Sequence, residues 1–264
     1  MEPILLPSKI QFKKSSNENE AILELEPCHQ GYGVTIGNAL RRVLLSSLPG
    51  AAITSVKLEG LTHEFSAIPN VAEDALQVIL NLKQVRLRSF SDEPVKLTLQ
   101  VSGEKEATAG DFEKNSQIEI VNPDQVIATI TDPKAEFKME VIVEKGRGYL
   151  VTEERDKSSL EAGTIATDAI FTPVRSVAIK VDNVRVGQIT NYDKLIMTVE
   201  TDGTISPESA VKEASKILID HFQLLGGAVE EESKEEKKTK RAKKAKAEKE
   251  ETETEAVPAE KQEE

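Results

Sequence analysis

Three glycines ahead of a helical stretch are the first residues whose spacing suggests chemistry. Gly31, Gly33 and Gly37 lie in the segment GYGVTIGNALRR. A glycine-rich turn at a helix N-terminus often binds phosphate, because its N–H groups and the helix dipole attract an anion. The spacing here is GxGxxxG, and the lysine that follows a Walker motif is missing. We therefore favour a tight glycine turn into a packed helix, and keep a free-standing nucleotide-binding enzyme as an alternative.

Other candidates for catalysis or metal binding are isolated in the sequence. Cys28 is the single cysteine, which excludes an intrachain disulfide and a four-cysteine zinc site. Adjacent Cys28 and His29 in an extended strand point to opposite faces, so they do not pair as nucleophile and base. His63 and His221 have no partner at metal-binding spacing, and no carboxylate cluster resembles a two-metal site. We expect no catalytic residue, no metal and no cofactor in this chain.

The composition indicates an acidic globular chain. The formal net charge is −12 over 264 residues, whereas binding to duplex DNA needs clustered lysine and arginine. Any link to DNA is therefore expected to be indirect. The N-terminus has no apolar stretch typical of a signal peptide, and no run of about eighteen apolar residues occurs. We expect a cytoplasmic protein without membrane contact.

Apolar periodicity predicts the elements that position these residues. Segments 8–13 and 21–26 alternate as short strands joined by a polar hairpin. From Thr35 the period becomes that of a helix, which Pro49-Gly50 ends. The apolar stripe of this helix consists of Ile36, Ala39, Leu40, Val43 and Leu44.

A second helix, a long run of strands and a last helix follow. Asn70 with Glu73 forms a capping-box-like start for a helix that carries Val71, Ala75, Leu76, Ile79 and Leu82. Strand patterns cover 51–58, 95–101, 118–121, 126–130, 137–143, 174–186 and 195–199. Ser206-Pro207 begins the last helix, which runs to about Leu225. The pattern predicts a mixed α/β (α+β) fold.

Two helix faces raise the question of what covers them. Arg41 and Arg42 are consecutive on the first helix, so at least one lies at the edge of the apolar stripe; it either snorkels into solvent or anchors a protein interface. On the last helix, Ala210 and Ala214 beside Ile217 and Leu218 permit close helix–helix approach. Packing within the chain and a twofold interface between two copies both agree with this pattern.

Residues 230–264 differ in composition from everything before them. They form a low-complexity charged tail with a basic middle, 237–249, and almost nothing to bury. Such a segment is expected to be disordered. Its lysines could contact nucleic acid, but a solvated tail is the commoner explanation of this composition.

Four segments together resemble one family. They are LEPCHQGYGVTIGNALRRVLLSSLPG, LTHEFSAIPNVAEDALQVILNLK, KGRGYL and VRVGQITNYDKLIMTVETDGTISPESA. In this order and spacing they closely resemble the amino-terminal domain of the bacterial and plastid alpha subunit of DNA-directed RNA polymerase. The resemblance covers roughly residues 3–226, and the blocks GNALRRVLLSSLPG and TDGTISPESA are each specific.

The resemblance implies a fold in two parts. A discontinuous dimerisation subdomain would comprise 1–49 and 171–229, and a mainly-β subdomain at 50–170 would be inserted into it. Two copies would pair through the first and last helices to form a platform, on which one copy binds the beta subunit and the other binds beta-prime. The dimer interface would include Ile36, Leu40, Val43, Leu44, Ala210, Ala214, Ile217 and Leu218.

The same resemblance implies contact residues for the large subunits. Arg42, Leu45 and Lys83 would grip them, and Val174 with Arg175 is a further candidate. An arginine suits this role, because its planar guanidinium can satisfy several partner oxygens at once. Catalysis and magnesium binding would belong to other chains, and the protein would reach the nucleoid through the polymerase. A generic dimeric adaptor unrelated to transcription is a further alternative.

The sequence departs from the family pattern at two places. Asn191 stands where the family usually has an acidic residue, which weakens any charge pairing there. The family usually continues through a linker into a helical C-terminal domain that binds promoter DNA, and here the charged tail stands in its place. Contact with promoter DNA and activators is therefore not expected from the resemblance, whereas assembly is.

Overall fold

Strands make up most of the regular structure, and they form two main antiparallel sheets. The computed structural model describes residues 4, 6–15, 17–61, 63–154, 161, 163–187 and 189–227. Two helices, α1 and α2, and a third over residues 207–227 complete the mixed α/β fold, which confirms the predicted class. The tail predicted to be disordered, 230–264, lies outside the described residues.

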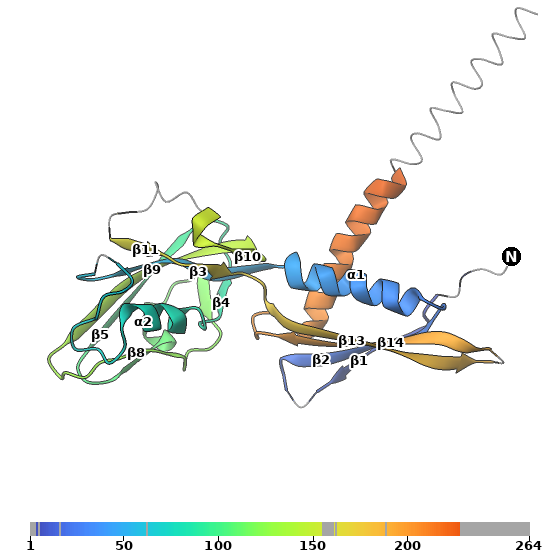
Figure 1. Cartoon of the computed structure of the whole chain (residues 1–264), viewed down its shortest axis with the longest axis horizontal. Helices are drawn as coiled ribbons and strands as arrows, with labels where there is room; N and C mark the ends of the chain where they lie inside the picture. The colour runs from blue at the N-terminus through green and yellow to red at the C-terminus, as the bar shows by residue number, and fades with distance from the viewer. Residues whose placement is uncertain are drawn as a thin grey trace, which may run out of the picture. The chain divides into compact units, whose positions relative to one another are not determined.

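The first sheet joins the beginning of the chain to a much later segment. Its strand order is β1-β2-β14-β13, and all neighbours are antiparallel. Helix α1 (Tyr32–Ser46) lies across one face of this sheet, mainly over β13 and β14 (Figure 1). The strands are β1 (Lys9–Lys14), β2 (Glu20–Cys28), β13 (Val174–Val186) and β14 (Ile189–Thr201).

Cross-strand register gives the first sheet an apolar face under α1. Leu25 pairs with Leu195 and Leu23 with Met197, and these four side chains are buried. Directly paired residues point to the same side of a sheet. The alternation of β2 and β14 therefore places one continuous row of apolar side chains beneath the helix, as the sequence pattern predicts for a half-buried strand.

Ion pairs cover the opposite face of the same sheet. Lys194 on β14 lies 3.0 Å from carboxylate oxygens of both Glu24 and Glu26 on β2. Lys13 and Lys9 on β1 add contacts of 2.5 Å to Glu24 and 2.7 Å to Glu26. Hydrogen bonds from these lysines lower the pKa of both glutamates, so the face stays charged and hydrated at neutral pH.

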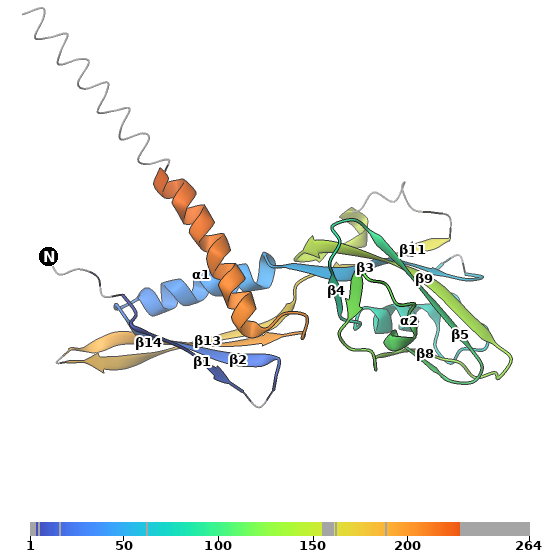
Figure 2. The ribbon, with the colours of Figure 1, turned by 180° about the vertical axis from the view of Figure 1, so that it is seen from behind.

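The second sheet holds the larger core. Its order is β5-β9-β3-β4-β7, and β11 pairs with β3. Helix α2 (Ala75–Leu82) lies among the strands of this part of the chain (Figure 2). Its residues Ala75, Val78 and Leu82 are buried in the same apolar cluster as the strands. The strands are β3 (Pro49–Leu58), β4 (Leu87–Ser89), β5 (Val95–Ser102), β7 (Ile118–Ile120), β9 (Glu136–Arg147) and β11 (Thr164–Ala166).

Two short strand pairs and two helical turns complete the described elements. The pairs are β6 (Glu106–Thr108) with β8 (Val126–Thr129), and β10 (Tyr149–Leu150) with β12 (Ala169–Ile170). The helical turns cover Ala109–Asp111 and Thr152–Glu154.

The second helix starts later than the sequence predicts. Asn70, the predicted N-cap, has a φ of 61°, and the helix begins at Ala75. Asp74 caps it instead, and its carboxylate accepts a hydrogen bond of 2.7 Å from the Gln77 N–H. Glu73, the predicted capping-box partner, accepts from the backbone N–H and hydroxyl of Thr129. Isolated β-bridges hold the preceding residues: Ala67 pairs with Asp74, and Val71 with Ile130.

The chain passes between the two sheets at two adjacent points, one at the start of β3 and one after β12. A Cβ on Gly50 would lie 1.8 Å from the carbonyl oxygen of Phe171, and one on Gly146 would lie 2.7 Å from its ring. Only glycine allows the strands to approach this closely. The Phe171 N–H also donates to the carbonyl of Gly148 at 2.8 Å. Phe171, at the second crossing point, therefore packs directly against Gly50, at the first.

The last helix, residues 207–227, contains the boundary between the two compact units of the chain. The first unit ends at Ser215 and the second begins at Lys216. This boundary differs from the predicted division into 1–49 with 171–229 and 50–170. Those subdomain limits therefore stay a prediction.

Candidate protein-binding surfaces

Helix α1 is anchored to the first sheet by its glycines. Gly33 and Gly37 are buried within the helix, one turn apart. A Cβ on Gly33 would lie 3.0 Å from the Asp193 Cβ, and one on Gly37 would lie 3.0 Å from Leu195 Cδ1. The two glycines therefore allow α1 to lie close to β14. Gly31, the N-cap, has a φ of 81°, so it supplies the tight turn predicted before the helix.

A buried carboxylate occupies the N-terminus of α1. Asp193 on β14 is 6% exposed, and its Oδ2 accepts a hydrogen bond of 3.1 Å from the Gly33 N–H. An anion at this position is stabilised by the helix dipole. The negative charge of Asp193 and the sheet packed against the glycines both disfavour a phosphate here. This geometry argues against the nucleotide-binding alternative.

The outward side of α1 carries the predicted contact residues. Arg41 and Arg42 are both exposed, and Leu45 is half-buried. Among the described residues, no carboxylate forms an ion pair with either arginine. The two guanidinium groups thus stand on a fixed helix, without a partner carboxylate in the described part of the chain.

The predicted dimer-interface residues fall into two groups. Leu40, Leu44, Ala210 and Ala214 are buried within the single chain, so their side chains are already covered. A second copy could not reach them directly without rearrangement. The other four are partly exposed at their positions on the two helices: Ile36, Val43, Ile217 and Leu218. Their role in pairing stays a prediction.

The end of the last helix exposes apolar side chains that the predicted interface leaves out. Ile219, Phe222, Leu224 and Leu225 are between 52% and 75% exposed. Phe222 and Leu225 continue the stripe of Leu218 at helical spacing. Leu225 already belongs to the apolar face that the sequence predicts for this helix, and Phe222 at the same helical spacing would have been found by completing that face.

Strand β1 exposes a second apolar surface. Ile10 pairs with Leu25 and Phe12 with Leu23, so both side chains lie on the apolar face of the first sheet. Helix α1 covers mainly β13 and β14 on that face. Ile10 remains 63% exposed and Phe12 37% exposed. Apolar surface of this kind is typical of an interaction site.

Lys83 lies in a polar cluster at the C-terminus of α2. Its Nζ is 3.3 Å from Asp168 Oδ2. The other carboxylate oxygen of Asp168 accepts hydrogen bonds from the Thr152 hydroxyl at 2.7 Å and the Thr152 N–H at 3.0 Å. These two bonds, followed by the bond from Lys83, hold the pKa of Asp168 well below its usual range. The Asp168 carboxylate therefore stays negatively charged at neutral pH and holds the Lys83 ammonium group in an ion pair.

The outer face of α2 carries two exposed leucines. Leu76 is 41% exposed and Leu80 is 45% exposed, one helical turn apart. Phe65, which is more exposed still, lies in the loop whose Ser66 carbonyl accepts from the Ala75 N–H at the start of α2. Leu76 and Leu80 thus form an exposed apolar pair on the helix whose C-cap is Lys83, and sequence reasoning missed this pair as a candidate surface.

The remaining predicted contact residues lie at the start of β13. Arg175 is exposed, whereas the Val174 side chain is only 2% exposed. A partner would therefore reach Arg175 and the backbone here, and not the Val174 side chain. Asn191 on β14 is exposed, and its amide donates a hydrogen bond of 3.1 Å to the side-chain oxygen of Gln30.

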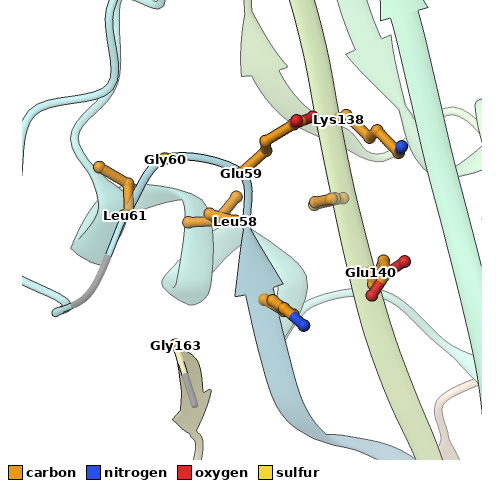
Figure 3. A pocket seen from close by; sticks show the side chains of 9 residues that line it. Leu58, Glu59, Gly60, Leu61, Lys138, Glu140 and Gly163 are labelled. Atoms are coloured by element: carbon orange, nitrogen blue, oxygen red, sulfur yellow. The ribbon is translucent and has the colours of Figure 1, made fainter. Parts of the chain in front are cut away.

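A pocket of about 480 Å³ lies at the end of β3 and the adjoining part of β9 (Figure 3). Lys57, Lys138, Glu59 and Glu140 give its lining two charges of each sign. Lys57 is paired with Glu161 at 2.9 Å, and Glu140 with Lys96 at 2.7 Å. The balanced charge and these ion pairs give no preference for an anionic or cationic ligand.

Across the described ranges, no three His, Cys, Asp or Glu side chains gather in an arrangement that would hold a metal ion. In the same part of the chain, no helix has the length and apolar character needed to cross a membrane.

Comparisons with known proteins agree on one family. The family described as the RNA polymerase Rpb3/RpoA insert domain matches residues 56–172. DNA-directed RNA polymerase subunit alpha of Moorella thermoacetica is 50% identical over 211 residues, which are 80% of this chain and 67% of that protein. The subunit of the same name from Flavobacterium psychrophilum is 50% identical over 212 residues, or 79% of this chain and 64% of that protein.

A longer match extends the coverage. The DNA-directed RNA polymerase subunit alpha of Chloroherpeton thalassium is 45% identical over 240 residues, which are 89% of this chain and 73% of that protein. The chain spans about two thirds of the length of the first two relatives. At this identity and coverage, the chain belongs to the family of DNA-directed RNA polymerase alpha subunits.

Proposed function

We propose that this chain is a homodimeric scaffold on which the beta and beta-prime subunits of a DNA-directed RNA polymerase assemble for DNA-templated RNA synthesis. Membership of the alpha-subunit family is the observation that carries this proposal. In this scheme the chain supplies protein surfaces only. The nucleotidyl transfer, with its metal ions, takes place on the large subunits.

Pairing of two copies is supported by apolar surface that the described chain leaves uncovered. One surface is the Ile10 and Phe12 side of the first sheet, and the other is the end of the last helix around Phe222. Burial of apolar area is the main driving force of such association. A twofold dimer would use each surface twice, which suits a pair of mutually complementary patches.

Capture of the large subunits is supported by the exposed groups on α1 and α2. Arg42 stands on a helix that Asp193 and two glycines fix to the sheet. Lys83 stands at the end of α2, the helix that exposes Leu76 and Leu80. A basic group next to apolar side chains suits a protein surface with carboxylates around an apolar centre.

The charge of the chain supports an indirect link to DNA. A formal net charge of −12 opposes association with phosphates. We propose that the chain reaches DNA in the cytoplasm through the assembled polymerase.

The proposal is tested by replacing the arginine on α1. Arg42→Ala should leave the homodimer intact and weaken capture of beta by about tenfold or more, because an interface arginine contributes roughly 2 kcal/mol. Capture is measured by pulling down the tagged full chain from cells that produce both large subunits. Arg41→Ala is the matched control, since it removes an equally exposed arginine from the same helix.

Each outcome of this experiment is informative. A smaller loss for Arg41→Ala than for Arg42→Ala supports the assignment of Arg42. A monomeric or unfolded Arg42→Ala protein would place the residue in the fold and not in the partner interface. If the unchanged chain captured neither large subunit, the scaffold proposal itself would fail.

A further inference from the structure

Arg88 on β4 connects the second sheet to the first. Its Nε donates a hydrogen bond of 2.9 Å to the carbonyl oxygen of Thr204, and its Nη2 donates to the same oxygen. Thr204 lies in the segment that links β14 of the first sheet to the last helix. Nη1 of the same side chain lies 2.9 Å from Glu119 on β7. The guanidinium group of Arg88, on a strand of the second sheet, thus binds the backbone of the segment that follows β14 of the first sheet.

The segment that receives Arg88 is itself held rigid. Asp202 Oδ1 accepts from the N–H and the hydroxyl of Thr204, at 2.9 Å and 2.5 Å. The Asp202 N–H donates to the carbonyl of Pro173 at 2.9 Å. These bonds close a turn in which the Thr204 carbonyl has a fixed direction. The carbonyl oxygen of Thr204, which accepts from Arg88, is therefore held in position by bonds that do not involve Arg88.

Close packing occurs beside the same contact. Gly203 has a φ of 92°, and a Cβ there would lie 3.3 Å from both Asn19 and Val121. Asn19 belongs to the β1–β2 hairpin of the first sheet, and Val121 directly follows β7 of the second. The Val121 N–H donates to the carbonyl of Arg86 at 2.9 Å, which ties this segment to β4. Gly203 thus allows residues from both sheets to meet at one point.

A second arginine faces the same turn. Arg86 is partly buried, and it interacts electrostatically with Asp202 as an attraction and with Arg175 as a repulsion. Burial is the main cause that lowers the pKa of Arg86. The Asp202 carboxylate therefore both closes the turn and attracts the partly buried guanidinium of Arg86.

The geometry points to Arg88 as a positioning residue, which fixes the second sheet relative to the first and thereby sets the spacing between the contact residues on α1 and on α2. The two chain crossings lie together at Gly50 and Phe171. Two adjacent crossings act as a hinge and leave one rotation free. The bonds from Arg88 to Thr204 form at a separate place and remove that rotation.

The consequence for assembly rests on the proposed function. Arg42 on α1 and Lys83 on α2 are carried by different sheets. A partner that contacts both binds with full affinity only to molecules in which their spacing is correct. When only a fraction of the molecules holds that arrangement, the apparent affinity falls by the same fraction.

The first part of the test measures the spacing without any partner. Spin labels are attached to Asn38→Cys on α1 and Lys134→Cys after β8, both exposed positions, in the full chain with buried Cys28 replaced by alanine. Labelled chain is diluted with excess unlabelled chain, so that distances within one copy dominate. The inference predicts a narrow distance distribution for the parent chain and a broader one for Arg88→Gln.

The matched control removes the other partner of the same guanidinium. Glu119→Gln abolishes the half-exposed ion pair of Arg88 and keeps both donors to Thr204. Its distance distribution is expected to match that of the parent chain. If Arg88→Gln left the distribution narrow, or if Glu119→Gln broadened it equally, the inference would be overturned. Should Arg88→Gln fail to fold, Asp202→Ala, which frees the acceptor turn, is judged by the same criterion.

The second part measures capture of the large subunits. Arg88→Gln should weaken capture by about tenfold while the homodimer persists, because about one molecule in ten would then hold the competent arrangement. Unchanged capture together with a broadened distribution would overturn the assembly consequence. If even the parent chain captured no large subunit, the proposed function would fail, whereas the distance measurement would still decide the role of Arg88.

Discussion

Two carboxylates of similar appearance in the sequence have different structural roles at the residue scale. Asp193 is buried and accepts the first-turn N–H of Gly33, so it fixes where α1 starts. Asp168 is partly exposed and joins Thr152 to Lys83. The first places the helix that carries Arg42, and the second places Lys83 itself. Each proposed contact residue therefore depends on an acidic residue that is distant in sequence.

Asp168→Asn tests this arrangement through stability. At pH 7 the substitution should lower the free energy of unfolding by about 1–2 kcal/mol, since hydrogen bonds to the charged carboxylate are lost or weakened. The folded-state pKa of Asp168 lies below the ordinary value of about 3.9. Its contribution is therefore present above about pH 4 and is lost as the pH falls through the folded-state pKa.

Urea denaturation at several pH values measures the effect. The difference between the parent chain and Asp168→Asn should be largest above about pH 5 and should narrow below about pH 4. Asp92→Asn is the matched control, because Asp92 is paired with Lys145 but its side chain is 88% exposed. We expect that control to leave unfolding unchanged at neutral pH. A difference for Asp168→Asn that grew as the pH fell would contradict the account.

At the element scale, the approach of α1 to the first sheet depends on small residues. Gly37→Ala would place a Cβ 3.0 Å from Leu195 Cδ1 and 3.1 Å from Ile179 Cγ2. This overpacking should cost about 1–3 kcal/mol, more than the gain of about 1 kcal/mol from replacing a helical glycine. Thermal and chemical denaturation measure the net loss.

Gly226→Ala provides the control for the same chemical change. Gly226 lies in the last helix, and a Cβ there would have no atom within 4 Å. The substitution should be neutral or slightly stabilising, since only helix propensity changes. If Gly37→Ala were as harmless as Gly226→Ala, the close approach of α1 to β14 would be wrong.

The last helix carries the element-scale test of pairing. Phe222→Glu should weaken the dimer by about thousandfold, because a twofold interface loses roughly 2 kcal/mol at each of two equivalent sites. Analytical ultracentrifugation over a range of concentrations measures this change. Phe90→Glu is the control, since Phe90 is 65% exposed, close to the 62% of Phe222, and lies just after β4. Equal dissociation constants for both variants would remove the last helix from the proposed interface.

At the scale of the whole molecule, apolar periodicity predicts elements better than it predicts their partners. Most strands of the two sheets and the first and last helices follow from the sequence, because most of them have one buried face, whereas the short strands β4 and β11 were not predicted. The start of α2 does not, since bridges between Ala67 and Asp74 and between Val71 and Ile130 decide it. The glycines of α1 suggested a turn, although two of the three lie inside the helix on its buried side.

The candidate surfaces, too, could be predicted only in part from the sequence. Periodicity places Leu40, Leu44, Ala210 and Ala214 on apolar faces, but it does not say that the chain itself covers them. The pairing of Lys83 with Asp168 joins residues 85 positions apart, and the contact of Arg88 with Thr204 joins residues 116 apart. Contacts over such separations depend on how the sheets are assembled, which no local pattern records.

The proposed scaffold is defined by the proteins with which the whole molecule assembles. The most direct test is native mass spectrometry of the tagged full chain, produced alone and together with the beta and beta-prime subunits. We expect a dimer in the first sample, and in the second a complex of two copies of this chain with one copy of each large subunit. A monomer in the first sample and no large partner in the second would contradict this expectation.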